Sequence, residues 1–168
     1  MSITTDQILT TTIQINSSDI FRTRNIDGII LHKLKKFEEK CTKNGYIVKD
    51  TTELVNRSVG KIRNIDNKSL IEYKINYKVK TISPSVGIIY TCIVNNISKM
   101  GLICFVEFGD TVDLKSSPLL VIVPKEYCEI EKYKEGQKIQ VETMDKRIKY
   151  MSSQIQIIGK INGSQSLP

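Results

Sequence analysis

The chain has 168 residues, of which 40% are hydrophobic and 26% charged, and its formal net charge is +7. This length holds one or two small domains, the composition is that of a globular protein, and the positive charge favours a polyanionic partner such as nucleic acid. No run approaches the ~20 apolar residues of a membrane span. The four cysteines contain no C-x-x-C pair and accompany a single histidine, a pattern that does not match the usual zinc spacings.

The start of the chain, Met1 to Gln7, is polar and predicts a flexible lead without a signal peptide. The expected absence of a signal peptide and the presence of free cysteines inside apolar segments both favour an intracellular, reducing compartment. The chain has no alanine and is rich in isoleucine, lysine and asparagine. Because those three residues have AT-rich codons, the composition points to an AT-rich genome.

The first half of the chain alternates between strand-like and helical patterns. β-Branched residues from Ile8 to Ile15 predict a strand. Apolar residues then recur at spacings of three and four, which predicts one amphipathic helix from Ile26 to Cys41 with Asn25 as its N-cap. Asn44 and Gly45 are expected to end this helix.

A second strand pattern completes this half. Apolar and polar residues alternate strictly from Ile71 to Lys80, which predicts a long strand with one buried face. The preceding segment, Ser58 to Asp66, is charged and contains Gly60, so we expect an exposed tip or turn. Together these patterns predict an α+β domain over residues 1–83, a small sheet with one packed helix.

Pro84 marks the expected boundary of a second domain over residues 84–168. Two apolar runs, starting at Gly87 and Gly101, predict a hairpin with a polar turn from Asn95 to Lys99. On its second strand, Leu102, Cys104 and Val106 are expected to point inward.

Three further strands are predicted after the hairpin, with a helical turn between the third and fourth strands of the domain. This order is typical of an OB-type five-stranded barrel, and a generic β-sandwich is the alternative. A polar excursion, Gly109 to Pro118, interrupts the pattern, and a basic turn with Lys146, Arg147 and Lys149 precedes the last strand. The tail from Asn162 is expected to fray. The three predicted strands are Leu119–Val123, Ile139–Thr143 and Gln154–Ile161.

Across both halves, the order and spacing of short motifs resemble the larger stalk subunit of archaeal and eukaryotic DNA-directed RNA polymerases. The resemblance covers nearly the whole chain, and no single motif carries it. Met100 and Ile103 depart from the aromatic residues common in such barrels, and the excursion has no clear counterpart. The matching segments are Lys33–Leu34 through Glu38–Glu39, Cys41–Thr42, Gly45–Ile47, Gly60–Ile62, Ile71–Tyr77, Pro84 with Gly87, Lys99–Gly101, Val121–Val123 before Lys125, and Ile157–Ile161.

The resemblance implies a non-catalytic subunit without a cofactor, metal or small-molecule substrate. Its N-terminal tip domain would dock on the polymerase core subunits. Its OB barrel would bind emerging single-stranded RNA, and a smaller stalk subunit, where one exists, would pack between the domains. The composition would suit a copy from a large DNA virus or another AT-rich genome, located in the virion and cytoplasmic viral factory, or in the nucleus if the source is a cellular eukaryote.

Two groups of residues are candidates for these contacts. Single-stranded RNA is held by cations along its backbone and by flat rings against its bases. We therefore expect RNA contacts from outward-facing rings and nearby lysines: Tyr90, Lys99, Phe105, Lys125 and Tyr127. The alternative for Tyr90 and Phe105 is packing against protein. For polymerase docking we expect an apolar side chain flanked by cations at the tip: Arg57, Gly60, Lys61, Ile62 and Arg63.

Other classes of function have weaker sequence support. A free-standing OB-fold RNA-binding adaptor in translation or RNA decay would need the barrel but not a docking tip. A nuclease or nucleotide-modifying enzyme would need clustered acids or a metal site, and Asp110 and Asp113 are the only close acid pair in a loop of the β-domain. His32 is expected to be a surface residue on a lysine-rich helix, so no catalytic residue is predicted.

Overall fold

The long strand predicted from the strict alternation is the centre of the first unit. In the computed structural model, which describes residues 3–163, this strand is β6 (Lys68–Ile82). It pairs antiparallel with β1 (Thr5–Asn16) over twelve residues, and its other edge pairs with β4 (Glu53–Arg57) and β5 (Lys61–Ile65). The expected flexible lead is therefore wrong from Thr5 onward, because β1 begins there; Met1 and Ser2 lie outside the described residues.

Two helices follow β1, where one longer helix was expected. The polar break after Asn16 forms α1 (Ser17–Thr23), and α2 covers Ile26–Lys35. The Asn25 cap is confirmed, since its side chain accepts a hydrogen bond of 3.0 Å from the Gly28 N–H. The helix does not continue to Cys41 because the backbone tightens into i→i+3 bonds and then turns left-handed at Glu39, with φ of 59°.

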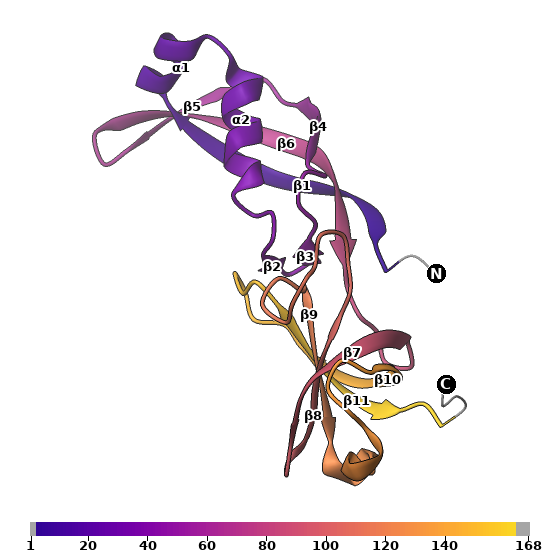
Figure 1. Ribbon diagram of the computed structural model, residues 1–168. Coiled ribbons are helices and arrows are strands. Elements are labelled where there is room, and N and C mark those ends of the chain that lie inside the picture. Colours follow the sequence, from indigo (N-terminus) through magenta and orange to yellow (C-terminus); the bar gives the residue numbers. More distant parts are fainter. Residues whose placement is uncertain (1–2, 164–168) are drawn as a thin grey trace. The chain divides into compact units, whose positions relative to one another are not determined.

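Helix α2 crosses one face of the sheet made by β1, β4 and β6 (Figure 1). Its apolar stripe meets the inward residues of β1 and β6, as its three-four spacing predicts. These side chains form the core of the first unit: Ile13, Ile15, Ile30, Leu34, Tyr73 and Ile75.

The expected exposure of Ser58 to Asp66 is confirmed except at half-buried Gly60, whereas the expected tip or turn conformation is wrong for most of the segment. Strand β5 occupies most of this segment, and the chain reverses afterwards at Asp66 and Asn67, which both have positive φ. Gly60 is not an open hinge, because a Cβ there would lie 2.6 Å from Ile71 and 2.9 Å from Tyr73. The exposed hairpin is thus formed by β5 and β6, and its chain reversal lies at the C-terminal end of the expected segment.

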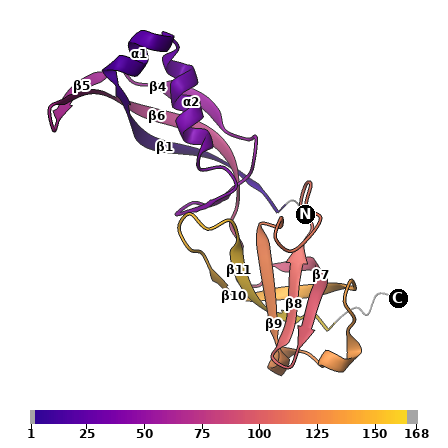
Figure 2. The same ribbon diagram turned by 60° about the vertical axis from the view of Figure 1, so that its left-hand side comes forward.

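The second unit contains a closed barrel of five strands, which confirms the predicted barrel. Its strand order is β10-β11-β9-β8-β7, with β11 and β9 parallel and the other pairs antiparallel. Figure 2 shows β7, β8 and β9 side by side. Two 3-10 turns, η1 (Lys125–Tyr127) and η2 (Ile130–Lys132), occupy the place of the expected helical turn. The strands are β7 (Ile89–Ser98), β8 (Gly101–Val106), β9 (Leu119–Pro124), β10 (Lys138–Arg147) and β11 (Ile155–Ile161).

The hairpin turn is shorter than the expected Asn95–Lys99. Strand β7 continues to Ser98, because a bulge between Val94 and Asn96 takes up one residue, and only Lys99 and Met100 form the turn. Inward placement of Leu102, Cys104 and Val106 is confirmed, since all three are buried. The barrel interior is therefore a dry core of alternating strand residues.

The two structural units are not separated at a single boundary in the sequence, because each contains two segments of the chain. The first unit comprises the described residues up to Glu39 together with Ile47–Ile82, and the second comprises Lys40–Tyr46 and the described residues from Ser83 on. Residues 40–46, which the sequence analysis assigns to the first domain, include β2 (Cys41–Thr42), paired with β3 (Gly45–Ile47). The Cys41 N–H donates to the Ser152 carbonyl at 2.7 Å, and this bond ties the segment to the barrel unit.

The remaining expectations concern the C-terminal end and the membrane. The expected frayed tail lies outside the described residues from position 164 onward, whereas Asn162 donates its N–H to the Gln140 carbonyl. Between residues 3 and 163, neither α-helix has the length and apolar content that crossing a bilayer requires.

Candidate nucleic-acid interface

One end of the barrel brings together three of the five expected RNA contacts. Gly101 pairs with Pro124 across β8 and β9, and the Lys125 N–H donates to the Met100 carbonyl at 3.0 Å. The exposed side chains of Lys99, Lys125 and Tyr127 consequently belong to the same barrel end. We call this the turn end of the barrel.

Tyr90 does not belong to this surface, and its expected outward direction is wrong. It is 6% exposed and shares the inward face of β7 with Cys92 and Val94. Burial, and to a smaller extent Cys92, raise the pKa of the Tyr90 hydroxyl above its ordinary value. A ring inside the barrel core cannot stack on a nucleotide base.

Phe105 lies on the outward face of β8 but is also closed to a base. Its strand neighbours Cys104 and Val106 point inward, and Phe105 pairs with Ile93 on β7 and Leu120 on β9. The ring is nevertheless only 6% exposed. Phe105 is also four residues from Gly101, about 13 Å along the strand, so the five expected contacts do not form one patch.

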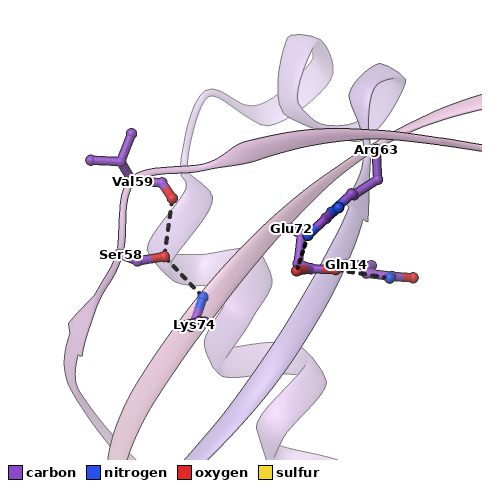
Figure 3. A network of polar contacts seen from close by, with 6 residues as sticks. All are labelled: Gln14, Ser58, Val59, Arg63, Glu72 and Lys74. Atoms are coloured by element: carbon purple, nitrogen blue, oxygen red, sulfur yellow. Dashed lines mark hydrogen bonds and ion pairs between the residues drawn. The ribbon is translucent and has the colours of Figure 1, made fainter.

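The docking candidates lie in the first unit, where Ile62 and Lys61 are exposed on β5. Ile62 is 74% exposed and pairs with Ile71 on β6. Arg63 reaches Glu72 across the same hairpin at 3.6 Å, and Glu72 also accepts a hydrogen bond from Gln14 at 3.3 Å (Figure 3). These contacts link β5 through β6 to β1, so Ile62 projects from a braced hairpin.

The connection between β4 and β5 is held to β6 as well. The Ser58 hydroxyl donates to the Val59 carbonyl and accepts from the Lys74 N–H, both at 3.0 Å (Figure 3). Val59 itself is 87% exposed. The hairpin and this connection together display two apolar side chains, Val59 and Ile62, without apolar cover.

Arg57 has an intramolecular role that its expected docking role did not include. Its guanidinium forms a 2.6 Å ion pair with Asp27 of α2 and lies over the Tyr73 ring, 5.3 Å from the ring centroid. Beside it is an open pocket of about 520 Å³. The lining residues are Asp27, Leu54, Val55, Asn56, Arg57, Ser58, Val59 and Gly60.

The sequence analysis noted the basic turn before the last strand but placed no site there. In the structure, the end of β10 and the loop that follows it carry three exposed cations, Lys146, Arg147 and Lys149, and an exposed Tyr150. We call residues 145–154 the basic loop. The available signal was the run Asp-Lys-Arg-Ile-Lys-Tyr, three cations with an aromatic residue, which is the composition expected of a nucleic-acid contact.

The remaining sequence predictions concern potential metal ligands and the acids of the polar excursion. No group of three or more His, Cys, Asp or Glu residues within positions 3–163 has the arrangement to hold a metal ion. Asp110 and Asp113 lie in the polar excursion, where the Asp113 carboxylate accepts the Ser116 N–H at 2.8 Å. That bond lowers the pKa of Asp113, so the carboxylate has a local structural partner.

No protein-family model matches the sequence, and a comparison with curated proteins finds no significant relative. The class is therefore defined by the structure itself: a two-unit, mostly β protein with an OB-like five-stranded barrel. Exposed cations and exposed apolar side chains occur on both units. Val59 and Ile62 stand out on the first unit, and the cations of the basic loop stand out on the barrel unit.

Proposed function

We propose that this chain is a non-catalytic stalk subunit of a multisubunit DNA-directed RNA polymerase. In this proposal the first unit is the tip domain, which docks on the polymerase core, and the barrel is an OB fold that binds emerging single-stranded RNA. The proposal applies to a nuclear enzyme or, for a viral source, to one active in the virion and cytoplasmic viral factory. A smaller stalk subunit is a further expected partner where one exists.

The observation that carries the proposal is that each unit displays a candidate contact surface of its own: exposed Val59 and Ile62 on the first unit, and the three cations of the basic loop on the barrel unit. Exposed aliphatic side chains of the first unit, chiefly Val59 and Ile62, suit insertion into an apolar pocket of another protein. Exposed cations of the barrel unit suit a polyanion. One chain that joins a protein-docking unit to an anion-binding unit fits a subunit that guides a nucleic acid at the surface of a larger assembly.

The docking arm is tested by Ile62→Asp in the full chain. A charge in place of a desolvated anchor removes its contacts and adds a desolvation cost, so we expect affinity for the polymerase core to fall at least about 30-fold. Ile62 is exposed, so the fold is expected to survive, which thermal unfolding followed by circular dichroism checks. The measurement is recovery of the large polymerase subunits with the tagged protein, quantified by mass spectrometry.

Ile8→Asp is the matched control, since Ile8 is 69% exposed on β1 of the same sheet. It is expected to keep wild-type recovery. Equal recovery with wild type, Ile62→Asp and Ile8→Asp would contradict docking through the hairpin. If the wild-type protein recovers RNA with ribosomal or decay factors but no polymerase subunit, the free-standing adaptor replaces the proposal.

A further inference from the structure

The basic loop is the most strongly cationic segment of the barrel unit that lacks local neutralisation. Within the described chain, no ion pair engages Lys146, Arg147 or Lys149. The one acid of the loop, Asp145, accepts the Lys146 N–H at 2.8 Å, so its charge is directed at the backbone. The three cations therefore face solvent without an acidic partner and favour an external anion.

A small polar pocket opens among these cations. Its volume is about 270 Å³, just below the ~300–1,000 Å³ of pockets that take drug-sized molecules. No apolar or acidic side chain contributes to it. The lining residues are Arg147, Lys149, Ser152, Gln154 and Gln156. A pocket of this size, lined by two cations and neutral hydrogen-bonding groups, fits a phosphate group rather than an extended apolar ligand.

The loop is held in shape before any ligand binds. Cys41 brackets it with two backbone hydrogen bonds, donating to Ser152 at 2.7 Å and accepting from Met151 at 2.8 Å. The Gln154 amide nitrogen donates to the carbonyls of Leu114 and Ser117, which ties the loop to the polar excursion. Ordering the loop on binding consequently costs little entropy.

Two of the pocket residues, Arg147 and Gln156, begin a row of residues on the outward face of the barrel. Arg147 pairs with Gln156, Gln156 with Leu120, and Leu120 with Phe105, so one row of outward residues crosses β10, β11, β9 and β8. Tyr150, 67% exposed, stands in the loop next to Lys149. An OB barrel binds oligonucleotides with the face of its second and third strands and the flanking loops. Tyr150 does not line the pocket, but its exposed ring offers a stacking surface to a base of a strand held there.

The turn end offers a weaker anion site, although the sequence analysis favoured it. The segment 125–135, which contains the two 3-10 turns, holds four acids and three cations: Glu126, Glu129, Glu131 and Glu135 against Lys125, Lys132 and Lys134. Glu129 already engages Lys132 in an ion pair at 2.5 Å. A polyanion approaching Lys99 and Lys125 meets these carboxylates, whereas one approaching the basic loop meets a single acid.

We propose that the basic loop is the primary contact for single-stranded RNA on this protein. Arg147 and Lys149 hold a phosphate in the pocket, and the Tyr150 ring stacks on an adjacent base. The identity of the polymer rests on the proposed function above. The location of the site rests on the pocket and its charges alone.

The test uses the full chain and a fluorescein-labelled twelve-nucleotide oligouridine, with affinity measured by fluorescence anisotropy at several KCl concentrations. Loss of the one phosphate that these two cations hold should reduce the slope of log affinity against log salt by about 0.7. We expect the double variant Arg147→Ala/Lys149→Ala to show that reduction and at least about tenfold weaker binding at low salt. Tyr150→Ala should weaken binding about fivefold or more, with the salt slope unchanged.

The matched control is Lys99→Ala/Lys125→Ala, which removes the same charge at the competing turn end and is expected to weaken binding clearly less than the loop variant does. A larger loss in the control than in the loop variant, or equal losses in both, overturns the inference. Absence of RNA binding by the wild type overturns it too, and with it the RNA-binding arm of the proposed function. Polymerase recovery tests the docking arm separately, so the failures are distinguishable.

Discussion

At the residue scale, three of the four cysteines occupy the positions of small apolar core side chains. Cys41, Cys92 and Cys104 are buried, and Cys128 is partly exposed. Burial raises the pKa of the Cys41 thiol to about 11 and that of Cys104 to about 12, from an ordinary value near 9. The folded protein therefore keeps both thiols protonated at pH values where an unfolded chain releases their protons.

This difference predicts an alkaline loss of stability. Above about pH 9 the unfolded state binds fewer protons than the folded state, so the free energy of unfolding falls as pH rises towards about 11 to 12. Urea denaturation at pH 8, 9, 10 and 10.5 measures it. Cys104→Ala should flatten the curve by up to about 1.4 kcal/mol per pH unit; a curve parallel to that of the wild type would argue against buried-thiol titration.

At the element scale, the close approach of β8 to β9 depends on Gly101. This residue begins β8 with φ of 141°, and a Cβ there would lie 2.1 Å from the Val123 carbonyl oxygen. Any residue with a Cβ at position 101 would therefore force the two strands apart. Since the same pair positions Lys125, a local defect here would also displace the turn end of the barrel.

Gly101→Ala is expected to lower the free energy of unfolding by more than about 3 kcal/mol, from the clash and the unfavourable φ together. Gly87→Ala separates the two causes, because Gly87 has φ of 89° and a Cβ added there would meet no atom within 4 Å. That variant should lose only about 1–2 kcal/mol. Urea denaturation measures the free energy of unfolding of both variants. Equal decreases in the two variants would mean that the strands relieve the clash at position 101 without a cost in stability.

At the scale of the whole molecule, the barrel unit is not a continuous piece of the chain. Residues 40–46 contribute buried Cys41 and Tyr46 to it, together with the two backbone bonds at Met151 and Ser152. A fragment that starts at the apparent domain boundary would uncover apolar surface and leave those backbone groups to solvent.

We therefore expect a fragment of residues 83–163 to be less stable than the same unit in the full chain, by on the order of several kcal/mol. Hydrogen exchange localises the defect. The Met151 amide, which donates to Cys41, should lose protection first, whereas the Ser152 amide donates to Lys149 within the fragment and serves as the internal control. Matching protection of Met151 in the fragment and the full chain would refute a structural role for residues 40–46.

Local patterns were sufficient wherever the determining contacts are close in sequence. The alternation from Ile71 to Lys80 required a strand, Asn25 capped α2, and the inward direction of Cys104 followed from its neighbours. The candidate sites were harder. Tyr90 was expected to face outward but faces inward, whereas Phe105 faces outward as expected and is nevertheless covered. A barrel closes every strand between two others, so the exposure of a side chain depends on residues far away in the sequence.

The strand-rich pattern, the core face of α2 and the succession of five barrel strands along the chain could be predicted from the sequence, because apolar periodicity encodes which face of an element is buried. The element boundaries and the location of the site depend on contacts that form only in the folded chain. The bulge after Val94, the left-handed turn at Glu39 and the bonds of Cys41 to the basic loop all depend on register or on distant partners. The polar pocket at the basic loop also depends on distant partners, since the pairing of β10 with β11 places Arg147 beside Gln156.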